Sequence, residues 1–410
     1  MSLDDALTAL LSGVEHLREQ ETMATLDADG RVLAQDLVSG LQVPAFDNSS
    51  MDGYAVRAVD GLKAGDVLAV TQRIAAGQEG TNLGAGQAAR IFTGAPLPRG
   101  ADAVVMQEDC EPLTENGQPA VRLLKSPKIG DWVRRSGEDV QRAAVVLTSG
   151  HRLGPAELGL AASLGLAHLP VLRRPRVALF STGDELVMPG QIEPAQMPPG
   201  AIYNSNRFFL KALLHRMGCE VSDLGIVPDR REATQAALRT AADHHDLILT
   251  SGGVSVGEED HVKPAVQALG QLSLWQISMK PGKPFAFGHV RRVTTAGQAY
   301  FIGLPGNPVS SFMTFVLLVR PFLLRLQASP AVSVPKLHLP AHFQIDKPDR
   351  RREFLRVRRN VSGGLDLFPN QSSGVLTSVV WGDGVVDLPA GQTVRPGDLV
   401  SFLPFSELLK

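Results

Sequence analysis

The stretch that decides the fold is DLILTSGGVSVGEED, residues 246–260. It opens with the apolar run 247–250, which is typical of a strand buried on both faces of a parallel sheet. Glycines and hydroxyl residues follow, and three acidic residues close the stretch. Backbone amides of a glycine-rich loop can surround a phosphate, and carboxylates can hold Mg²⁺ beside it. We therefore predict an anion site here, with a loosely structured turn as the alternative.

Strands and helices alternate on both sides of this stretch. RVALFS at 176–181 is strand-like, and helical patterns occupy 204–218 and 231–244. A strongly apolar helix is expected at 309–327. The alternation predicts a doubly wound, mostly parallel α/β domain over residues 171–328, with helices covering both sheet faces.

The flanking sequence has a different texture. Short alternating runs divided by Gly and Pro predict an inserted β domain at 44–140. Residues 1–43, with an amphipathic helix at 3–19, should join the Ala/Leu-rich residues 141–170 in one linking domain. The tail 329–410 alternates again, which indicates a small β-barrel-like domain. The expected fold class is therefore multidomain α/β plus β.

The length, net charge and cysteine content of the chain limit the classes of partner and compartment that are expected. The chain has 410 residues, more than one hydrophobic core usually organises, and a formal net charge of −2. That charge provides no global basic field, so neither nucleic acid nor an anionic membrane is an expected partner. Cys110 and Cys219 are the two cysteines, which indicates a reducing compartment rather than a disulfide framework. An acidic N-terminus and the lack of an apolar run of about eighteen residues predict a soluble cytoplasmic protein.

Three further loops carry unusual compositions, each at the end of a predicted strand, where a parallel sheet binds ligands. STGDEL, residues 181–186, combines small residues with carboxylates, and its alternative interpretation is an ordinary helix N-cap. GLPGNPVS, residues 303–310, is constrained by two prolines and leads into a helix. The candidate binding positions in these loops and in the glycine-rich stretch are Ser181, Thr182, Gly183, Ser251, Gly252, Gly253, Ser255, Gly257, Pro305, Gly306 and Pro308.

The third of these loops, KPGKP at 280–284, presents two lysines on a Pro-Gly turn. Lys280 and Lys283 suit an anion, although a solvated surface turn has the same composition. Asp52, in the polar loop 47–54, is open to three roles: metal ligand, base or turn residue.

The segment RREFLRVRR at 351–359 alternates with period two. Leu355 and Val357 should therefore lie on one face, and an arginine-rich set on the other. An exposed arginine face would meet an anionic substrate or partner, or would only be solvated. The histidines lack zinc-ligand spacing, so the available chemistry favours phosphoryl or nucleotidyl transfer with a hard metal ion. The arginine-rich set is Arg352, Phe354, Arg356 and Arg358.

Seven motifs occur along the chain in one order. This set resembles the molybdopterin molybdenumtransferase family, which includes bacterial MoeA and the gephyrin E domain. The resemblance runs from the first helix to the C-terminal β domain, and all seven motifs in order are far more specific than any one. The motifs are SSMDGYA (49–55), IFTGAPLPRGADAVVMQE (91–108), RRSGEDV (134–140), FSTGDEL (180–186), TSGGVSVGEED (250–260), KPGKPFAFG (280–288) and GLPGNPVS (303–310).

The resemblance implies an elongated homodimer, whose active site lies between the α/β domain of one subunit and other domains of its partner. It implies a reaction that takes adenylylated molybdopterin and molybdate, with Mg²⁺, to molybdenum cofactor and AMP. The catalytic residues transferred motif by motif are Asp52, Thr93, Glu185, Asp229, Asp260, Lys280 and Lys283.

The resemblance also assigns binding residues. Asp260, Glu185 and Asp229 would hold the metal ion, and Arg351 with Ser372 or the adjacent serine would reach the substrate from the C-terminal domain. The sequence departs from the family at Arg230, where a second acid commonly follows the aspartate. That departure puts a paired-carboxylate role there in doubt.

Two other functions fit parts of the sequence. The related molybdopterin adenylyltransferase, which activates molybdopterin with ATP, shares the TSGG-type loop but not the long β insertion or the C-terminal β domain. A non-catalytic dimeric scaffold, as in the gephyrin E domain, would not need the charged loop residues. The adenylyltransferase and molybdoenzyme-maturation proteins are candidate partners.

Overall fold

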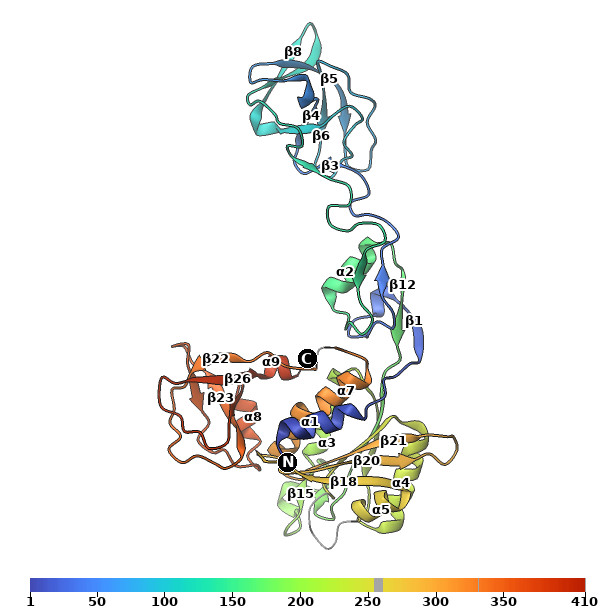
Figure 1. The fold of residues 1–410 in the computed structure, drawn as a ribbon, viewed down its shortest axis with the longest axis vertical. Coiled ribbons are helices and arrows are strands. Elements are labelled where there is room, and N and C mark those ends of the chain that lie inside the picture. Colours follow the sequence, from blue (N-terminus) through green and yellow to red (C-terminus); the bar gives the residue numbers. More distant parts are fainter. Residues whose placement is uncertain (254–260, 331, 410) are drawn as a thin grey trace.

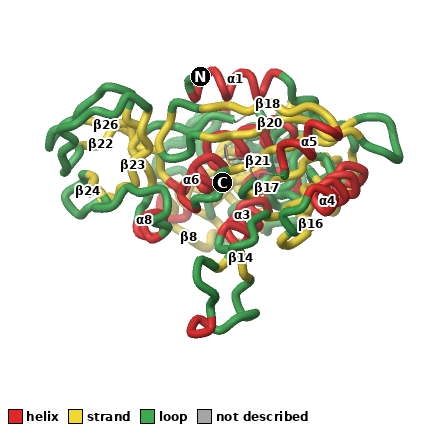
Figure 2. Tube along the Cα trace, turned by 90° about the horizontal axis from the view of Figure 1, so that it is seen from below, coloured by secondary structure: helices red, strands yellow, loops and turns green. Residues whose placement is uncertain are grey.

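The computed structural model describes residues 1–253, 261–330 and 332–409. The molecule is elongated, with the inserted β-rich part at one end and the α/β part at the other (Figure 1). The C-terminal β part lies beside the α/β part in both views (Figures 1 and 2). The expected fold class, multidomain α/β plus β, is confirmed.

The α/β part is built on a six-stranded sheet in the order β16-β13-β17-β21-β20-β18. The first four strands are parallel, and β20 and β18 are added antiparallel at one edge. The sheet is therefore mostly parallel, as the alternation of strands and helices predicted. Its strands are β13 (Arg176–Ser181), β16 (Glu220–Ile226), β17 (Leu247–Ser251), β18 (Gly270–Gln276), β20 (Pro284–Arg291) and β21 (Gln298–Leu304).

Helices cover both faces of this sheet, as burial along β13 shows. Val177 and Leu179 pack into the core that also contains α3 and the long helix after β21. Ala178 and Phe180 pack into a second core under α4 and α5. A strand buried on both faces reads as one apolar run rather than an alternating one. The helices are α3 (Asn206–Arg216), α4 (Arg231–His244), α5 (Val262–Leu269), α6 (Pro308–Thr314), the π-helical η5 (Phe315–Val319) and α7 (Arg320–Leu326).

The continuous helix Pro308–Leu326 has 19 residues and is apolar enough to cross a membrane by length and composition. The chain therefore contains a longer apolar run than the sequence analysis allowed. Its most apolar window is 89% buried inside the protein, so it is the core helix of the α/β part. Pro321 lacks an N–H and would clash with a carbonyl of the preceding turn. The π-helical turn Phe315–Val319 just before it widens the helix where that clash would occur.

Helix α1 spans Leu3–Ser12, which is shorter than the helix expected over 3–19. It ends at Gly13, and the chain continues extended, so that the N–H of Leu17 donates to the carbonyl of Leu326 in α7. The apolar side chains of α1 belong to the α/β core, and the helix lies beside α7 (Figure 1). It does not pack on the second Ala/Leu-rich segment, where the sequence analysis placed it.

A two-stranded antiparallel ribbon, β1 with β12, connects the α/β part to a small linking part with its own core. The chain enters and leaves the inserted part side by side, where the N–H of Val43 donates to the carbonyl of Val140 at 2.8 Å. The elements of this region are β1 (Gln20–Ala24), η1 (Thr25–Asp27), β2 (Leu37–Val38), β11 (Val145–Leu147), α2 (Pro155–Ser163) and β12 (His168–Leu172).

The inserted part is a six-stranded sheet in the order β7-β4-β6-β5-β9-β8. Two apolar cores lie on its two faces, since Ala88 joins one and Ala89 the other. Its elements are β3 (Asn48–Ser49), β4 (Gly53–Val56), η2 (Ala58–Asp60), β5 (Val67–Ile74), β6 (Gln87–Ile91), β7 (Ala103–Met106), η3 (Gln107–Asp109), β8 (Cys110–Glu115), β9 (Gln118–Leu123) and β10 (Val133–Arg134).

The C-terminal part is a sheet in the order β19-β23-β25-β26-β22, with β24 paired to β23. Strand β19 comes from the chain between β18 and β20, so this sheet is joined to the α/β part by hydrogen bonds. The remaining elements are β14 (Leu186–Val187), η4 (Pro194–Gln196), β15 (Ile202–Tyr203), β19 (Met279–Lys280), β22 (Leu337–Pro340), β23 (Arg352–Arg359), β24 (Leu365–Leu367), α8 (Thr377–Trp381), β25 (Gly384–Leu388), β26 (Leu399–Pro404) and α9 (Phe405–Leu408).

Candidate functional site

The carboxyl ends of three neighbouring parallel strands form one edge of the central sheet. Ser181 of β13 pairs with Ser251 of β17, which pairs with Leu304 of β21. The loops after these residues therefore start side by side. Asn206, at the start of α3, ties two of them together, because its Nδ2 donates to Ser251 Oγ and to the Gly306 carbonyl, both at 2.7 Å. Asn206 was not among the predicted site residues, and no motif of the sequence pointed to it.

Three buried hydroxyls at this edge have no hydrogen-bond partner within the described part of the chain. They are the side chains of Ser181, Thr182 and Thr250. An unpaired buried hydroxyl costs about 1–3 kcal/mol, so each is expected to find a partner in water or a ligand. The first two were predicted binding residues, and the third, Thr250, lies in β17 directly before the predicted binding residue Ser251.

Two glycines let the backbone approach this edge closely. Gly252 has φ +91°, and a Cβ there would lie 2.8 Å from the Thr182 carbonyl oxygen. A Cβ on Gly253 would lie 2.4 Å from Val262 Cγ2. Only glycine fits such positions without a shift of the backbone. Three further predicted residues of this loop, Ser255, Gly257 and Asp260, lie outside the described residues.

The loop after β21 is closed from the side by the C-terminal part. Pro305 is buried, Gly306 is exposed with open space around it, and Pro308 is the first residue of α6. The N–H of Val309 donates to the carbonyl of Ser373 at 2.9 Å. The serine loop that was assigned a binding role is therefore adjacent to this loop. Its other member, Ser372, is exposed.

Carboxylates gather at the same edge. Asp229 follows β16, and its Oδ1 is buried without a partner in the described residues. Burial raises the pKa of Asp229, and the negative charges of Asp184 and Glu185 raise it further, against a lowering by His261. Gly183 has φ +141° and its backbone lies against the Glu185 carboxylate. The structure thus brings two predicted metal ligands into one neighbourhood, together with Asp184, which the prediction omitted.

These carboxylates do not by themselves complete a metal centre. Within residues 1–253, 261–330 and 332–409, no group of three or more His, Cys, Asp or Glu side chains is arranged to hold an ion. The third predicted ligand, Asp260, lies outside those ranges.

Lys280 is not a free cation in this structure. Its Nζ lies 2.8 Å from Glu353 Oε1 and 3.3 Å from Asp349 Oδ2, both in the C-terminal part. Arg351, another predicted binding residue, shares the second carboxylate through its Nη2 at 3.1 Å. The hydrogen bond to Glu353 is the main cause that raises the pKa of Lys280. Lys283 is exposed, and no ion pair to it is seen among the described residues.

The prediction of an exposed arginine face on β23 is wrong. Arg356 is 1% exposed, and its guanidinium donates to Ser378 Oγ and to the carbonyls of Phe354 and Ser372. Burial lowers the pKa of Arg356 to about 10. Arg352 is held by Asp387 and Asp4, and only the last arginines of the strand are exposed. Period two identified which residues share a face, but both faces of this strand are covered.

Asp52 and Thr93 form a pair in the inserted part. The backbone N–H and the hydroxyl of Thr93 both donate to Asp52 Oδ1 at 2.8 Å. These hydrogen bonds lower the pKa of Asp52, so the carboxylate is ionised at neutral pH. The pair lies at the opposite end of the molecule from the α/β part (Figure 1). A single chain therefore does not bring it to the loops described above.

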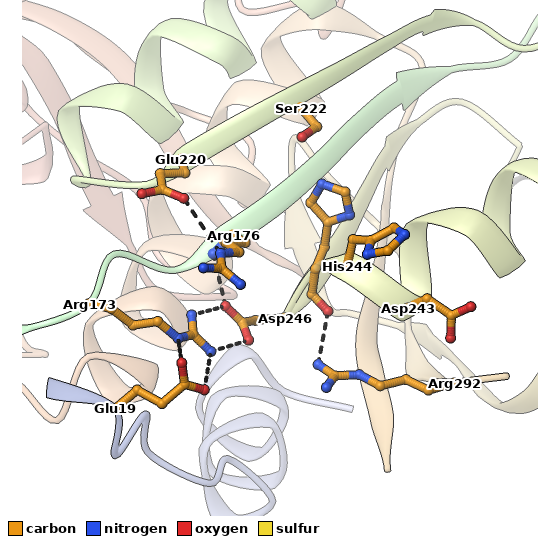
Figure 3. A pocket seen from close by; sticks show the side chains of 10 residues that line it. Glu19, Arg173, Arg176, Glu220, Ser222, Asp243, His244, Asp246 and Arg292 are labelled. Carbon is orange, nitrogen blue, oxygen red and sulfur yellow. Dashed lines mark hydrogen bonds and ion pairs between the residues drawn. The ribbon is translucent and has the colours of Figure 1, made fainter. Parts of the chain in front are cut away.

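A cavity of about 520 Å³ lies at the other edge of the central sheet, at the amino ends of its strands (Figure 3). Its most buried charges neutralise each other, since Arg173 makes two hydrogen bonds to Asp246, at 2.7 and 2.8 Å. Arg173 also binds Glu19, which precedes β1. None of the predicted site residues lines this cavity. We assign it a structural role, the attachment of the ribbon to the sheet.

Comparison with known proteins agrees with this arrangement of parts. Family models match residues 1–165 (MoeA N-terminal region, domain I and II), 178–325 (probable molybdopterin binding domain) and 338–405 (MoeA C-terminal region, domain IV). Two solved Pyrococcus MoeA proteins superpose on the chain. One has a TM-score of 0.83 at 26% identity and covers 98% of this chain and 99% of its own. The other has a TM-score of 0.78 at 31% identity, with 99% of each chain covered.

Relatives in other bacteria match over the same length. The molybdopterin molybdenumtransferase of Haemophilus influenzae is 37% identical, with 100% of both chains covered. That of Nostoc sp. is 35% identical and covers 96% of this chain and 91% of its own. Full-length similarity at this level, together with the three matching regions in order, places the chain in the molybdopterin molybdenumtransferase (MoeA) family.

Proposed function

We propose that this transferase of molybdenum cofactor biosynthesis inserts molybdenum, supplied as molybdate, into adenylylated molybdopterin and releases AMP. The observation that carries the proposal is a set of buried hydroxyls, those of Ser181, Thr182 and Thr250, beside the close-packed Gly252; within the described residues these hydroxyls have no hydrogen-bond partner. Hydroxyl donors and backbone amides at the carboxyl ends of parallel strands are what a phosphate-bearing ligand requires. Relatives named molybdopterin molybdenumtransferase support the substrate class.

The hydroxyls and the lysines of the site would have different roles in binding the substrate. The three hydroxyls would donate to phosphate oxygens, each charge-assisted bond contributing about 1.5–3 kcal/mol. Lys283, which is exposed, would offset the charge of molybdate or of the terminal phosphate. Lys280 forms a cluster with Arg351 and two carboxylates in which the four formal charges cancel. Lys280 would therefore orient the substrate through a directed hydrogen bond rather than attract it through net positive charge.

The residues present fit a magnesium ion. Asp229 has a buried oxygen that no group of the described residues pairs with, next to two further carboxylates. Mg²⁺ is typically bound by one or two carboxylates plus substrate phosphates. Asp229 and Glu185 would hold the ion with Asp260, which lies outside the described residues. When bound, it would polarise the adenylyl phosphate.

We also propose that the active unit is a homodimer. Asp52 and Thr93 lie far from the α/β loops of their own chain (Figure 1). A second copy related by twofold symmetry would bring the pair of one chain to the loops of the other. Asp52, ionised and fixed by Thr93, would act at that composite site.

The proposed reaction is tested by product analysis of the purified protein. With adenylylated molybdopterin, molybdate and Mg²⁺, we expect AMP and molybdenum-loaded cofactor. With molybdopterin and ATP alone we expect no pyrophosphate. Pyrophosphate release in the second mixture would instead identify an adenylyltransferase, and absence of either product with normal folding would support a scaffold.

The composite site is tested by pairing two inactive variants. Each homodimer of Asp52→Asn or Asp229→Asn should keep only a small residual rate, about a hundredth of the wild-type AMP release or less. If the two variant chains pair at random, half of the dimers are mixed, and each mixed dimer contains one intact site of two. The mixture should therefore recover about a quarter of the wild-type AMP release. A mixture as inactive as its parents would place all catalytic residues of a site within one chain.

A further inference from the structure

Arg90 lies near the Asp52–Thr93 pair, three residues before Thr93 in the chain. It belongs to β6 and lies opposite Tyr54 in β4. Its Nη1 donates to the Gly53 carbonyl at 3.0 Å, and its Nη2 donates to Gln107 Oε1 at 2.6 Å. The guanidinium carbon also lies over two aromatic rings, 5.2 Å from the Tyr54 centroid and 4.8 Å from the Phe92 centroid. The fork of donors is thus fixed in direction.

Gly53 and Gln107, the two residues that accept hydrogen bonds from Arg90, are each connected to Asp52. The N–H of Gln107 donates to the Asp52 carbonyl at 3.0 Å, and Gly53 is the next residue in the chain. Thr93, which binds the Asp52 carboxylate, lies three residues after Arg90, in the turn that follows β6. The Arg90 side chain therefore links the Gly53 carbonyl, and through Gln107 the Asp52 carbonyl, to the segment that carries the hydrogen-bond donor of Asp52.

Packing fixes the backbone of β4 but not Asp52, which immediately precedes this strand. A Cβ on Gly53 would lie 2.0 Å from the Val105 carbonyl oxygen, so the strand is in close contact with its neighbour β7. Asp52 is the residue immediately before this tight segment, where the loop begins. Its orientation depends on the hydrogen bonds at the loop, because packing fixes only the strand that follows.

We propose that Arg90, acting through Gln107 and the Gly53 carbonyl, is a positioning residue that aims the Asp52 carboxylate at the reacting groups. Arg90 itself does not touch the substrate. The inference rests on the proposed function, since it requires Asp52 to act in AMP release.

Arg73 provides a matched control. It is the neighbour of Arg90 across β5 and β6, and its guanidinium stacks on the same Phe92 ring at 4.4 Å. Within the described residues, no hydrogen bond connects it to the Asp52 loop. The two arginines therefore share charge, face and the Phe92 ring, and Arg90 differs by its contacts to Gly53, Gln107 and the Tyr54 ring.

The test measures AMP release by the full-length dimer. Arg90→Lys keeps the charge but loses the fork, and we expect kcat to fall about 10- to 100-fold, with the KM for adenylylated molybdopterin changed less than about twofold. Gln107→Ala, at an exposed position, should lower kcat in the same way without altering any charge. Arg73→Lys should match the wild type in both constants. Unchanged thermal unfolding would show that each variant is folded.

A second comparison separates positioning from a structural or direct role. In the Asp52→Asn background, adding Arg90→Lys should cause no further loss, because the group that Arg90 orients is already gone. A further loss there, an equal loss from Arg73→Lys, or wild-type kcat in Arg90→Lys would each overturn the proposal. Full activity of Asp52→Asn alone would overturn both the assigned role of Asp52 and this inference. A strong loss of activity in Asp52→Asn together with a fully active Arg90→Lys would overturn only the inference.

Discussion

Replacement of Asp229 by asparagine should reduce AMP release about 100- to 1,000-fold, the size of effect seen when one group that stabilises a charged transition state is removed. Asp229 is the one carboxylate of the described cluster with a buried oxygen that lacks a partner. The variant keeps the shape of the side chain but removes the negative charge that would hold Mg²⁺. Steady-state kinetics at saturating Mg²⁺ would measure the loss.

The same substitution should not destabilise the protein. Burial raises the pKa of Asp229 above its ordinary value of 3.8, so the native state holds this proton more tightly than the unfolded state. Between 3.8 and the raised value, the contribution of this group to stability therefore falls as pH rises, and above both values the ionised group is a net burden. Asparagine resembles the protonated acid, so the variant should unfold at an equal or higher temperature near neutral pH.

Asp243→Asn is the matched control for this experiment. Asp243 lines the cavity at the opposite edge of the sheet and accepts backbone hydrogen bonds from Val293 and Thr294. The same chemical change there should leave AMP release unchanged. Asp229→Asn with wild-type kinetics, or with a loss that only follows a lower unfolding temperature, would remove Asp229 from the proposed magnesium site.

Replacement of Asp246 by alanine should lower the free energy of unfolding by about 3–5 kcal/mol, because it leaves a largely buried arginine without its main partner. The side chains of Arg173 and Asp246 are 15% and 10% exposed. The aspartate also accepts the N–H of Arg176 at 2.8 Å, which fixes the start of β13. Urea unfolding followed by circular dichroism would measure the change.

Glu19→Ala is the corresponding control. Glu19 binds the same guanidinium, but its side chain is 70% exposed. Surface ion pairs typically contribute about 0–1 kcal/mol, so this variant should differ little from the wild type. Equal effects of the two substitutions would show that the pair with Asp246 is no stronger than a surface contact.

Part of this molecule follows from short-range sequence patterns. Apolar runs with strand length predicted β13 and β17, and strand polarity placed the loops after them at one edge of the sheet. Glycines 252 and 253 stand where a Cβ would collide with neighbouring atoms, so their positions could be read from the sequence as points of close approach. Backbone preferences and the spacing of buried residues are set within a few neighbouring residues. They can therefore be recognised in a single amino-acid sequence.

Other features depend on which surfaces meet. The β23 arginines were expected to form an exposed face. A period of two shows which side chains share a face of a strand, but it does not show what covers that face. Arg356 is in fact buried by α8 and the loop before it. Lys280 was expected to be free, yet carboxylates some seventy residues later neutralise it. Helix α1 ends early and packs on α7 because the chain must run extended toward the ribbon.

The sequence by itself determined the fold class, the family motifs and the chemical types of residue at the sheet edge, because these depend on local periodicity and composition. Only the tertiary structure decided which charges neutralise one another and which hydroxyls of the described residues are left unpaired. It also decided that Asp52 and Thr93 lie at the opposite end of the molecule from the α/β loops. Those outcomes are set by contacts between segments distant in sequence, and no pattern within a single segment encodes them.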